Sequence, residues 1–379
     1  MNKKIFFYSN HREDDLSIGI TKKVHSQIKT FKKLGYKVFY SAYINKGIGI
    51  FNNENKLIYY KKCIRYDGSL GHIVRRIDNL LISAKFIRHH HFDIGYYRFH
   101  FWDLYYLKLV KAIKKYGGKV CIEAHCYPYE TDSSLSMQII YFIDRIYNKY
   151  AFKYVDLVAG ITESDEKIWG CNTVKIENGI NFEDCHVRTV LVNNESTINL
   201  VCVANEQKTH GVERIIRGLF EYYKDGTESI KLWLVGEYLQ STQNLINELK
   251  LQKYIFLVGK KHGDELYYFY NHAHLGVGPL ALYLGNYHRG ECLKTKEYMS
   301  VGLPFITSAS NDAPIASHRS VLVFEEDDKP IDINKIVNFV RQNPETQEQA
   351  NELHKYAVNN YNWESQIKKI LLGLGEDIL

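Results

Sequence analysis

The sequence alternates short runs of β-branched and aromatic residues with segments in which apolar residues recur every three or four positions. The first pair shows the pattern: Ile5–Ser9 predicts a strand, and the apolar stripe from Ile20 to Leu34 predicts the buried face of a helix. Such alternation is typical of βαβ units, in which helices join and cover parallel strands. Later strands are predicted at 37–42, 94–97, 120–123 and 157–161, and helices near 69–88, 102–116 and 134–150.

The same alternation starts again after a polar stretch near 181–197, which is typical of a linker. At 379 residues the chain is long enough for two cores. We therefore expect an α/β protein of two Rossmann-like, doubly wound domains, 1–180 and 181–361, with a C-terminal helix at 362–379 packing back on the first. Strands of the second half are predicted at 198–204, 231–235, 254–258, 275–277, 305–307 and 321–324.

Ligands of open α/β sheets bind beyond the carboxyl ends of the strands, so a cleft between the domains is the expected site.

The N-terminal residues do not fit a signal peptide, because the apolar run Ile5–Tyr8 is too short and charged residues soon follow it. No stretch approaches the apolar length that a membrane-spanning helix needs. The seven cysteines show neither a Cys-x-x-Cys pair nor a zinc spacing to histidine. These patterns predict a cytoplasmic protein without disulfides, attached at most to the inner face of the cell membrane.

Charge is distributed unevenly along the chain. Residues 1–150 hold 26 Lys and Arg against 12 Asp and Glu, whereas residues 151–379 hold 23 against 31. This asymmetry indicates that the first half faces something anionic. The basic residues form no nucleic-acid-binding motif, so no nucleic acid partner is expected. An anionic membrane surface is the better candidate, since each Lys or Arg near one gains roughly 1 kcal/mol; a codon-biased composition is the alternative explanation.

The most informative segment covers residues 290–306. It predicts a short helix that ends at Gly302, followed by Pro304 and a strand. Free N–H groups at the helix start, around Cys292–Lys294, suit an anion such as a diphosphate. Glu297 lies one turn further on, where its carboxylate can accept hydrogen bonds from two ribose hydroxyls. The alternative is a surface helix with an ordinary solvated glutamate.

This segment resembles the nucleotide-sugar signature of glycosyltransferase family 4, in which a Leu-Lys-x-x-Glu-Tyr-Met-x-x-Gly-x-Pro stretch precedes a strand. The resemblance implies a GT-B fold with an acceptor-binding N-terminal domain and a nucleotide-sugar-binding C-terminal domain. It also implies a retaining transfer from a UDP- or GDP-linked sugar, with no cofactor and no obligatory metal. Other stretches that extend the resemblance, in the family's order, are Val155–Ser164, Ile176–Asn181, Val203–Ile215, Leu232–Gly236 and Phe256–Gly259.

The resemblance also implies roles for individual residues around the donor. The segment after the strand at 198–204 would contact the diphosphate, and Gly19 would allow a close backbone approach to phosphate. Glu297 would anchor the ribose. The predicted donor-binding residues are Gly19, Asn205, Lys208, His210, Gly259, Leu293, Lys294 and Glu297.

The sequence departs from the family pattern in three places. Many members carry Glu-x7-Glu, but position 289 here is Arg289, so Glu291 is the nearest carboxylate and is assigned the catalytic role beside Glu297. Many members carry Arg and Lys on the diphosphate loop, whereas this chain has Asn205 and His210 near those positions, with Lys208 between them. The glycine-rich turn near the N-terminus is reduced to a single glycine.

A second informative segment, residues 121–130, leaves a predicted strand for an aromatic loop. His125 sits comparably to a family histidine close to the transferred sugar, so it is a predicted catalytic residue; a structural histidine is the alternative. Arg98, Tyr127 and Glu130 are the predicted acceptor contacts, although Tyr127 is one of 30 tyrosines and core packing is the favoured alternative for it.

Two other groups of ionisable residues are predicted to have no binding role. The acidic stretches at 13–15 and 325–328 are expected to be solvated loops that bind no metal. His89–His91 is expected to be exposed.

Together these features predict a retaining glycosyltransferase that acts on a glycan or lipid-linked glycan in bacterial surface polysaccharide (capsule) synthesis. One alternative is a catalytically silent GT-B protein that serves as partner or scaffold of an active transferase, which the departures at 205, 210 and 289 favour. Another is a sugar-nucleotide epimerase on the same fold, which would need a cluster of acids and histidine that the sequence does not reveal.

Overall fold

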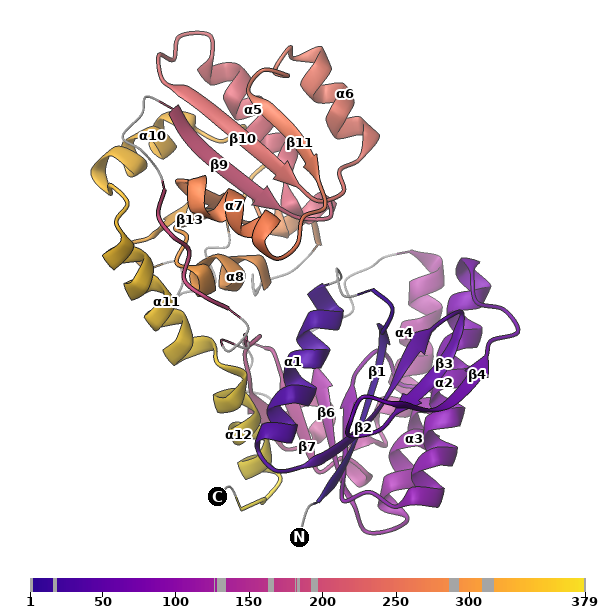
Figure 1. Cartoon of the computed structure of the whole chain (residues 1–379). Coiled ribbons are helices and arrows are strands. Elements are labelled where there is room, and N and C mark those ends of the chain that lie inside the picture. Colours follow the sequence, from indigo (N-terminus) through magenta and orange to yellow (C-terminus); the bar gives the residue numbers. More distant parts are fainter. Residues whose placement is uncertain are drawn as a thin grey trace. The chain divides into compact units, whose positions relative to one another are not determined.

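The computed structural model describes residues 3–15, 19–125, 127, 134–162, 167–180, 182, 185–191, 197–285, 293–308 and 317–377. The chain divides into two compact units, which Figure 1 shows in ribbon form. The first unit comprises Met1–Gly179 and Trp363–Leu379, and the second comprises Ile180–Asn362.

The sheet of the first unit has the strand order β4-β3-β2-β1-β5-β6-β7-β8. Strand β1 is central and pairs in parallel with both β2 and β5, and the strands from β5 to β8 continue in parallel. The strands are β1 (Lys4–Arg12), β2 (Lys37–Ile44), β3 (Gly47–Phe51), β4 (Leu57–Lys62), β5 (Ile94–Arg98), β6 (Lys119–Ala124), β7 (Leu157–Gly160) and β8 (Thr173–Lys175).

Strands β3 and β4 extend this sheet as an antiparallel edge that the sequence pattern did not predict. Asn45 and Lys46 between β2 and β3 both have positive φ, at 46° and 57°. A type I′ hairpin turn requires that conformation at both central positions, but lysine is not a residue that signals it. The glycines within β3 also weaken its strand pattern.

The sheet of the second unit is entirely parallel, with the order β11-β10-β9-β12-β13-β14. All of its strands were predicted. They are β9 (Thr197–Val203), β10 (Ser229–Val235), β11 (Ile255–Gly259), β12 (Leu275–Val277), β13 (Phe305–Thr307) and β14 (Val321–Val323).

Helices cover both faces of each sheet. In the first unit Phe6 and Tyr8 of β1 pack with α2 and α3, while Ile5 and Phe7 pack with α1 and α12 on the opposite face. This is the alternation that a strand buried on both faces requires. The first-unit helices are α1 (Gly19–Lys33), α2 (Gly68–His90), α3 (Leu104–Lys114), α4 (Leu135–Asn148) and α12 (Trp363–Gly373). The second-unit helices are α5 (Val212–Tyr222), α6 (Gln240–Glu248), α7 (Asp264–His272), α8 (Leu293–Val301), α10 (Ile333–Gln342) and α11 (Gln347–Tyr361).

One detail of helix α1 differs from the prediction. Ile20, expected on the buried stripe, is 46% exposed, whereas Lys23 and Gln27 are buried. A polar network described below holds these two side chains inside the unit.

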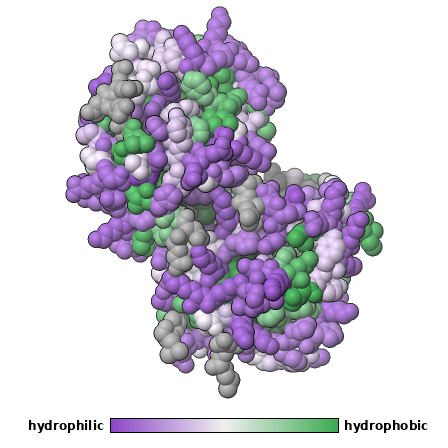
Figure 2. Space-filling view, in the orientation of Figure 1, coloured by the Kyte–Doolittle hydropathy of each residue, from purple (hydrophilic) through white to green (hydrophobic). Residues whose placement is uncertain are grey.

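The visible surface of each unit is mostly hydrophilic, with apolar patches between the polar side chains (Figure 2). None of the helices in the described ranges combines the length and apolar content that crossing a membrane requires.

Candidate functional site

In the second unit, several predicted donor residues follow the carboxyl ends of the parallel strands. Asn205 lies just beyond β9, and its side-chain oxygen accepts the Glu237 N–H at 3.2 Å. Gly259 ends β11 with a φ of 77°, and its carbonyl accepts the Gly236 N–H at 2.9 Å. The carboxyl edge is where ligands of such sheets bind.

The turn η4 (Lys208–His210) stands between β9 and α5. The Leu280 N–H donates to the His210 carbonyl at 3.1 Å, and the Ala281 N–H donates to the Thr209 carbonyl at 3.2 Å. These bonds fix the turn against the segment that follows β12. Lys208 itself is exposed.

The ring of His210 is held neutral. Its Nδ1 accepts the Gln207 N–H at 3.2 Å. Burial, and then the charge of Lys294, lowers the pKa of His210 to about 3. The structure therefore brings together His210 and Lys294, two predicted donor residues from distant parts of the sequence.

Lys294 lies in the first turn of α8, half-buried like Leu293 before it. Its ammonium nitrogen is buried and has no hydrogen-bond partner among the residues that the structure describes. A buried cation without a hydrogen-bond partner is costly, so the arrangement favours an anionic ligand. The N–H groups of the same helix turn add to this preference.

Glu297 lies one turn further along α8 and is half-buried. Within the described ranges, no hydrogen bond or ion pair occupies its carboxylate. After burial, the charge of Glu297 raises the pKa of Tyr270 and, more weakly, of Tyr267, which places the carboxylate near both rings.

Tyr298 fixes the helix that carries Lys294 and Glu297. Its hydroxyl accepts the Val203 N–H at 3.0 Å and donates to the Val277 carbonyl at 3.2 Å. These two hydrogen bonds hold helix α8 against β9 and β12. The predicted catalytic Glu291, and Arg289 with it, lie outside the described residues.

In the first unit, Arg98 and His125 lie at neighbouring strand ends. Arg98 is the last residue of β5 and is in register with Glu123 of β6, and His125 directly follows β6. The Arg98 Nη1 atom is buried without a hydrogen-bond partner in the described part of the chain. Gly19, predicted near phosphate, begins α1 in this unit rather than in the donor unit.

Glu123 and Lys23 form a buried ion pair beneath these two residues, which the sequence analysis missed. Lys23 Nζ lies 2.7 Å from Glu123 Oε1, and the side chains of Gln27 and Tyr96 donate to Glu123 Oε2, each at 2.6 Å. Burial alone would raise the pKa of Glu123, but the charges of Lys23 and Arg98 hold it below its usual range. One signal was available: Glu123 is the only carboxylate in a strand of otherwise apolar interior positions, and a buried charge needs a partner.

His125 is a neutral imidazole beside these cations. The protein atoms packed around it, and then the charges of Arg98 and Lys23, lower its pKa well below the ordinary histidine value. The residue as a whole is nevertheless exposed. An unprotonated, accessible ring can accept a hydrogen bond from a sugar hydroxyl.

Two further residues, Tyr127 and Glu130, were predicted to contact the acceptor. Tyr127 is half-buried and packs edge-on against Trp169, with ring centroids 6.5 Å apart. This is the core packing that the sequence analysis favoured for it. Glu130 lies outside the described residues.

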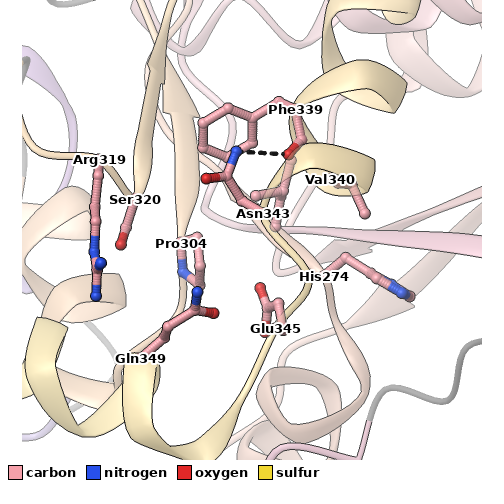
Figure 3. A pocket seen from close by; sticks show the side chains of 10 residues that line it. His274, Pro304, Arg319, Ser320, Phe339, Val340, Asn343, Glu345 and Gln349 are labelled. Atoms are coloured by element: carbon pink, nitrogen blue, oxygen red, sulfur yellow. Dashed lines mark hydrogen bonds between the residues drawn. The ribbon is translucent and has the colours of Figure 1, made fainter.

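A separate hollow of the second unit lies at the amino ends of β12, β13 and β14 (Figure 3). Its lining includes His274, Pro304 and Ser320, each within a residue of where its strand begins, and the Asn343 side chain there donates to the Phe339 carbonyl at 2.9 Å. None of the predicted donor residues lines it. Since it lies at the opposite end of the strands from Asn205 and Gly259, we do not assign it to the donor.

Comparison with protein families gives one match. Residues 197–342 match the model of the family described as Glycosyl transferases group 1. This range contains Asn205, Lys208, His210, Lys294 and Glu297. No curated protein sequence matches the chain significantly.

Solved structures show the fold of the whole chain. A glycosyltransferase from Rickettsia africae is similar with a TM-score of 0.65 and 11% identity, over 98% of both chains. The catalytic domain of starch synthase IV from Arabidopsis thaliana, bound to ADP and acarbose, has a TM-score of 0.67 and 11% identity over 99% of both chains. HepE from Anabaena, in complex with UDP and glucose, has a TM-score of 0.60 and 13% identity, over 99% of this chain and 100% of HepE. The predicted two-part GT-B fold is confirmed.

Proposed function

We propose that this chain, whose second unit carries a glycosyl transferases group 1 domain, is an enzyme that moves a sugar from a nucleotide diphosphate sugar to a glycan or lipid-linked glycan, in the synthesis of a bacterial surface polysaccharide. The observation that carries the proposal is the first turn of α8. There the buried Lys294 ammonium lies without a hydrogen-bond partner among described residues, beside neutral His210 and one turn before Glu297.

The chemistry of sugar transfer explains this arrangement. As the glycosidic bond to the diphosphate breaks, negative charge grows on the leaving group, so fixed N–H groups and a cation stabilise the transition state. Lys294 and the α8 N–H groups supply both, and Lys208 is a second cation on η4. The donor is UDP- or GDP-linked, the transfer retains the anomeric configuration, and no cofactor or obligatory metal takes part.

Glu297 and His210 would orient the donor. The Glu297 carboxylate accepts hydrogen bonds from the two ribose hydroxyls, which requires that no protein group already occupies it. Neutral His210 leaves Lys294 as the cation for the diphosphate and avoids a repulsive pair of cations.

The acceptor would bind to the first unit. His125 accepts a hydrogen bond from a sugar hydroxyl, and the unpartnered Nη1 of Arg98 suits a phosphate oxygen of a lipid-linked acceptor. The Lys23–Glu123 pair keeps Arg98 and His125 in place, because Glu123 is in register with Arg98 and two residues before His125.

Helix α4 is the part of the first unit that we expect to contact a membrane surface. Leu135, Ile139, Phe142 and Ile146 are 79%, 56%, 64% and 39% exposed, and their spacing puts them on one helix face. Basic residues follow the helix at 149 and 153. An exposed apolar face with lysines beside it is typical of helices that lie in an anionic lipid interface.

Vesicle sedimentation tests this part of the proposal. The Ile139→Ser/Phe142→Ser variant should lose binding to phosphatidylglycerol vesicles. The control variant Leu372→Ser, whose side chain is 64% exposed on α12, should keep it. Equal sedimentation of all three proteins would contradict a membrane role of α4.

Product analysis with UDP- and GDP-sugars tests the enzymatic proposal. The purified protein should release nucleoside diphosphate slowly by donor hydrolysis and faster with acceptor, and Lys294→Ala should slow both. A scaffold protein would release none. An epimerase would instead change the sugar configuration while the nucleotide sugar stays intact, so each alternative has its own product.

A further inference from the structure

Three ionisable side chains converge at the carboxyl end of β1 in the first unit. His11 lies in β1, Glu13 is the residue directly after the strand, and His25 comes from α1. Glu13 Oε2 lies 3.1 Å from His11 Nε2 and 3.2 Å from His25 Nε2. One ligand atom from each residue falls within 4.8 Å of the other two.

The sequence analysis expected Glu13 to belong to a solvated acidic loop, and that prediction is wrong for this residue. The Glu13 side chain is only 15% exposed, and His11 is fully buried. Asp14, by contrast, pairs with Arg12 at the surface, with a side chain 31% exposed. Two of the groups that contact the buried Glu13 carboxylate are distant in the sequence: His25 lies on α1 and Tyr40 on β2.

The contact between Glu13 and His25 differs from an ordinary hydrogen bond. Although His25 Nε2 lies 3.2 Å from the carboxylate oxygen, this buried nitrogen has no hydrogen-bond partner in the described part of the chain. A ring nitrogen that lies this close to a carboxylate oxygen can coordinate one ion together with it.

The distances fit a tetrahedral ion. With metal–ligand bonds of about 2.0–2.1 Å, two ligand atoms of a tetrahedron lie about 3.3 Å apart. The two measured separations of 3.1 and 3.2 Å are close to that value. The rings of His11 and His25 are nearly perpendicular, at 88°, with centroids 5.7 Å apart, so both can present Nε2 to one point without clashing.

Outer partners orient two of the three ligands. Ser9 Oγ lies 2.5 Å from His11 Nδ1, which leaves Nε2 of that ring to face Glu13. The Tyr40 hydroxyl donates to Glu13 Oε1 at 3.0 Å, so Oε2, which contacts the Nε2 atoms of both histidines, is the oxygen that would face an ion. Such second-layer hydrogen bonds are the usual support of histidine and carboxylate metal ligands.

We propose that His11 Nε2, His25 Nε2 and Glu13 Oε2 bind one divalent ion of the zinc class. Two imidazoles and one carboxylate suit zinc and its transition-metal neighbours, whereas calcium and magnesium prefer all-oxygen sites. Three protein ligands leave a fourth position for water or an anionic oxygen. The side chain of His25, 29% exposed, gives the ion a path from solvent. The metal-site proposal does not rest on the proposed sugar transfer, and no step of the transfer is assigned to the ion.

Titration of the chelator-treated, full-length protein with zinc chloride tests the proposal. Calorimetry should show saturable binding of one equivalent, and zinc should raise the thermal midpoint because the ion binds the folded chain. Cobalt should give the visible absorption of a tetrahedral site. His25→Ala and Glu13→Gln should each weaken zinc binding at least about a hundredfold, and Tyr40→Phe about tenfold, as for second-layer partners.

Matched variants exclude other metal ligands on the chain. His89–His91 is exposed, so the His89→Ala/His91→Ala variant must bind zinc as the wild type does. Substitution of the half-buried His25 carries less risk of a folding defect than replacement of the fully buried His11. Binding below one equivalent, wild-type affinity in His25→Ala, or loss of binding in the His89/His91 variant would overturn the proposal. Donor binding in His25→Ala is measured separately, so failure of the metal site and failure of the sugar-transfer proposal are distinguishable.

Discussion

Lys294 and His210 are 84 positions apart in the sequence, yet the charge of Lys294 adds to the effect of burial in lowering the pKa of His210. Lys294 lowers the pKa of His210 because an ammonium near an imidazole disfavours the imidazolium form. In Lys294→Ala the pKa of His210 should therefore rise from about 3, while burial still keeps it below the ordinary value. Imidazole NMR signals measured against pH check this. An unchanged pKa would mean that the two side chains do not share a site.

The same substitution should weaken donor binding. A charge-assisted contact contributes about 1.5–3 kcal/mol, which corresponds to roughly a tenfold to hundredfold loss of affinity. Lys294→Arg, which keeps the charge, should retain part of the affinity. Equal affinities of the Ala and Arg variants would contradict an electrostatic role.

His274 gives the second unit a pH-dependent stability. Its Nδ1 accepts the Asn199 N–H at 3.0 Å, and burial followed by the charge of Arg188 lowers its pKa to about 4. Between pH 6.5 and about 4, His274 is protonated in the unfolded chain, where its pKa is about 6.5, but stays neutral in the folded state. The contribution of His274 is thus complete above pH 6.5 and is lost as the pH falls towards 4.

The His274→Gln variant, which cannot titrate, should reduce the loss in free energy of unfolding between pH 7 and pH 5. Urea unfolding at both pH values measures this difference. The variant His262→Gln, with an exposed side chain on the same unit, serves as the control. A His274→Gln protein that loses as much stability as the wild type would contradict the assignment.

At the residue scale, sequence reasoning worked best where local context defines a role. The places of Lys294 and Glu297 in the first turns of α8 could be predicted, because a helix start and a one-turn spacing are readable from the sequence. Their roles in donor binding stay a prediction. The strand pattern around Glu123 signals a buried carboxylate, but it does not identify Lys23 as the partner, because Lys23 comes from a distant segment. In the same way, the sequence does not show that His25 lies beside His11 and Glu13, since that contact also depends on the tertiary fold.

At the element scale, the turn η4 depends on a glycine. Gly211 has a φ of 59°, and a Cβ added to it would lie 2.9 Å from Ala281 Cβ and from the Leu280 carbonyl carbon. Gly211→Ala should push η4 away from this segment, move His210 and weaken donor binding. The cost in stability should exceed the roughly 1 kcal/mol of the backbone conformation alone.

Gly263 is the control for donor binding. Its φ is also positive, at 52°, and nothing lies within 4 Å of an added Cβ, but its ψ of −134° differs from the 32° of Gly211. Gly263→Ala should therefore lose stability through its own backbone conformation and still bind donor normally. Donor titration of both variants checks this, and equal loss of donor affinity would contradict the packing argument.

The elements themselves were largely predictable. The parallel strands of both sheets except β8 were found from buried β-branched runs, because such strands carry a continuous apolar signal. Strand β8 is only three residues long, without a fully buried position, and was missed. The β3–β4 edge was missed because its turn residues, Asn45 and Lys46, and its glycines carry no comparable signal. The exposed Ile20 shows the limit of helical periodicity. The apolar stripe predicts that a helix forms, but it does not predict that Lys23 and Gln27 are buried while Ile20 is exposed.

At the scale of the whole molecule, the two units carry different chemistry. The second unit holds the residues assigned to the donor except Gly19, and the first holds the exposed face of α4 and the Arg98–His125 pair. The basic excess of residues 1–150 also lies within the first unit. Sugar, acceptor and linkage depend on loop residues that neither periodicity nor charge specifies.

The central claim is that Glu297 and the start of α8 bind a nucleotide sugar, and calorimetric titration of UDP- and GDP-sugars tests it most directly. The wild type and Glu248→Ala, which removes an exposed carboxylate of α6, should bind one donor with equal affinity. Glu297→Ala should bind it roughly tenfold to hundredfold more weakly, because two hydrogen bonds from the ribose to a charged group are lost. Equal affinity of Glu297→Ala and the wild type would contradict the account.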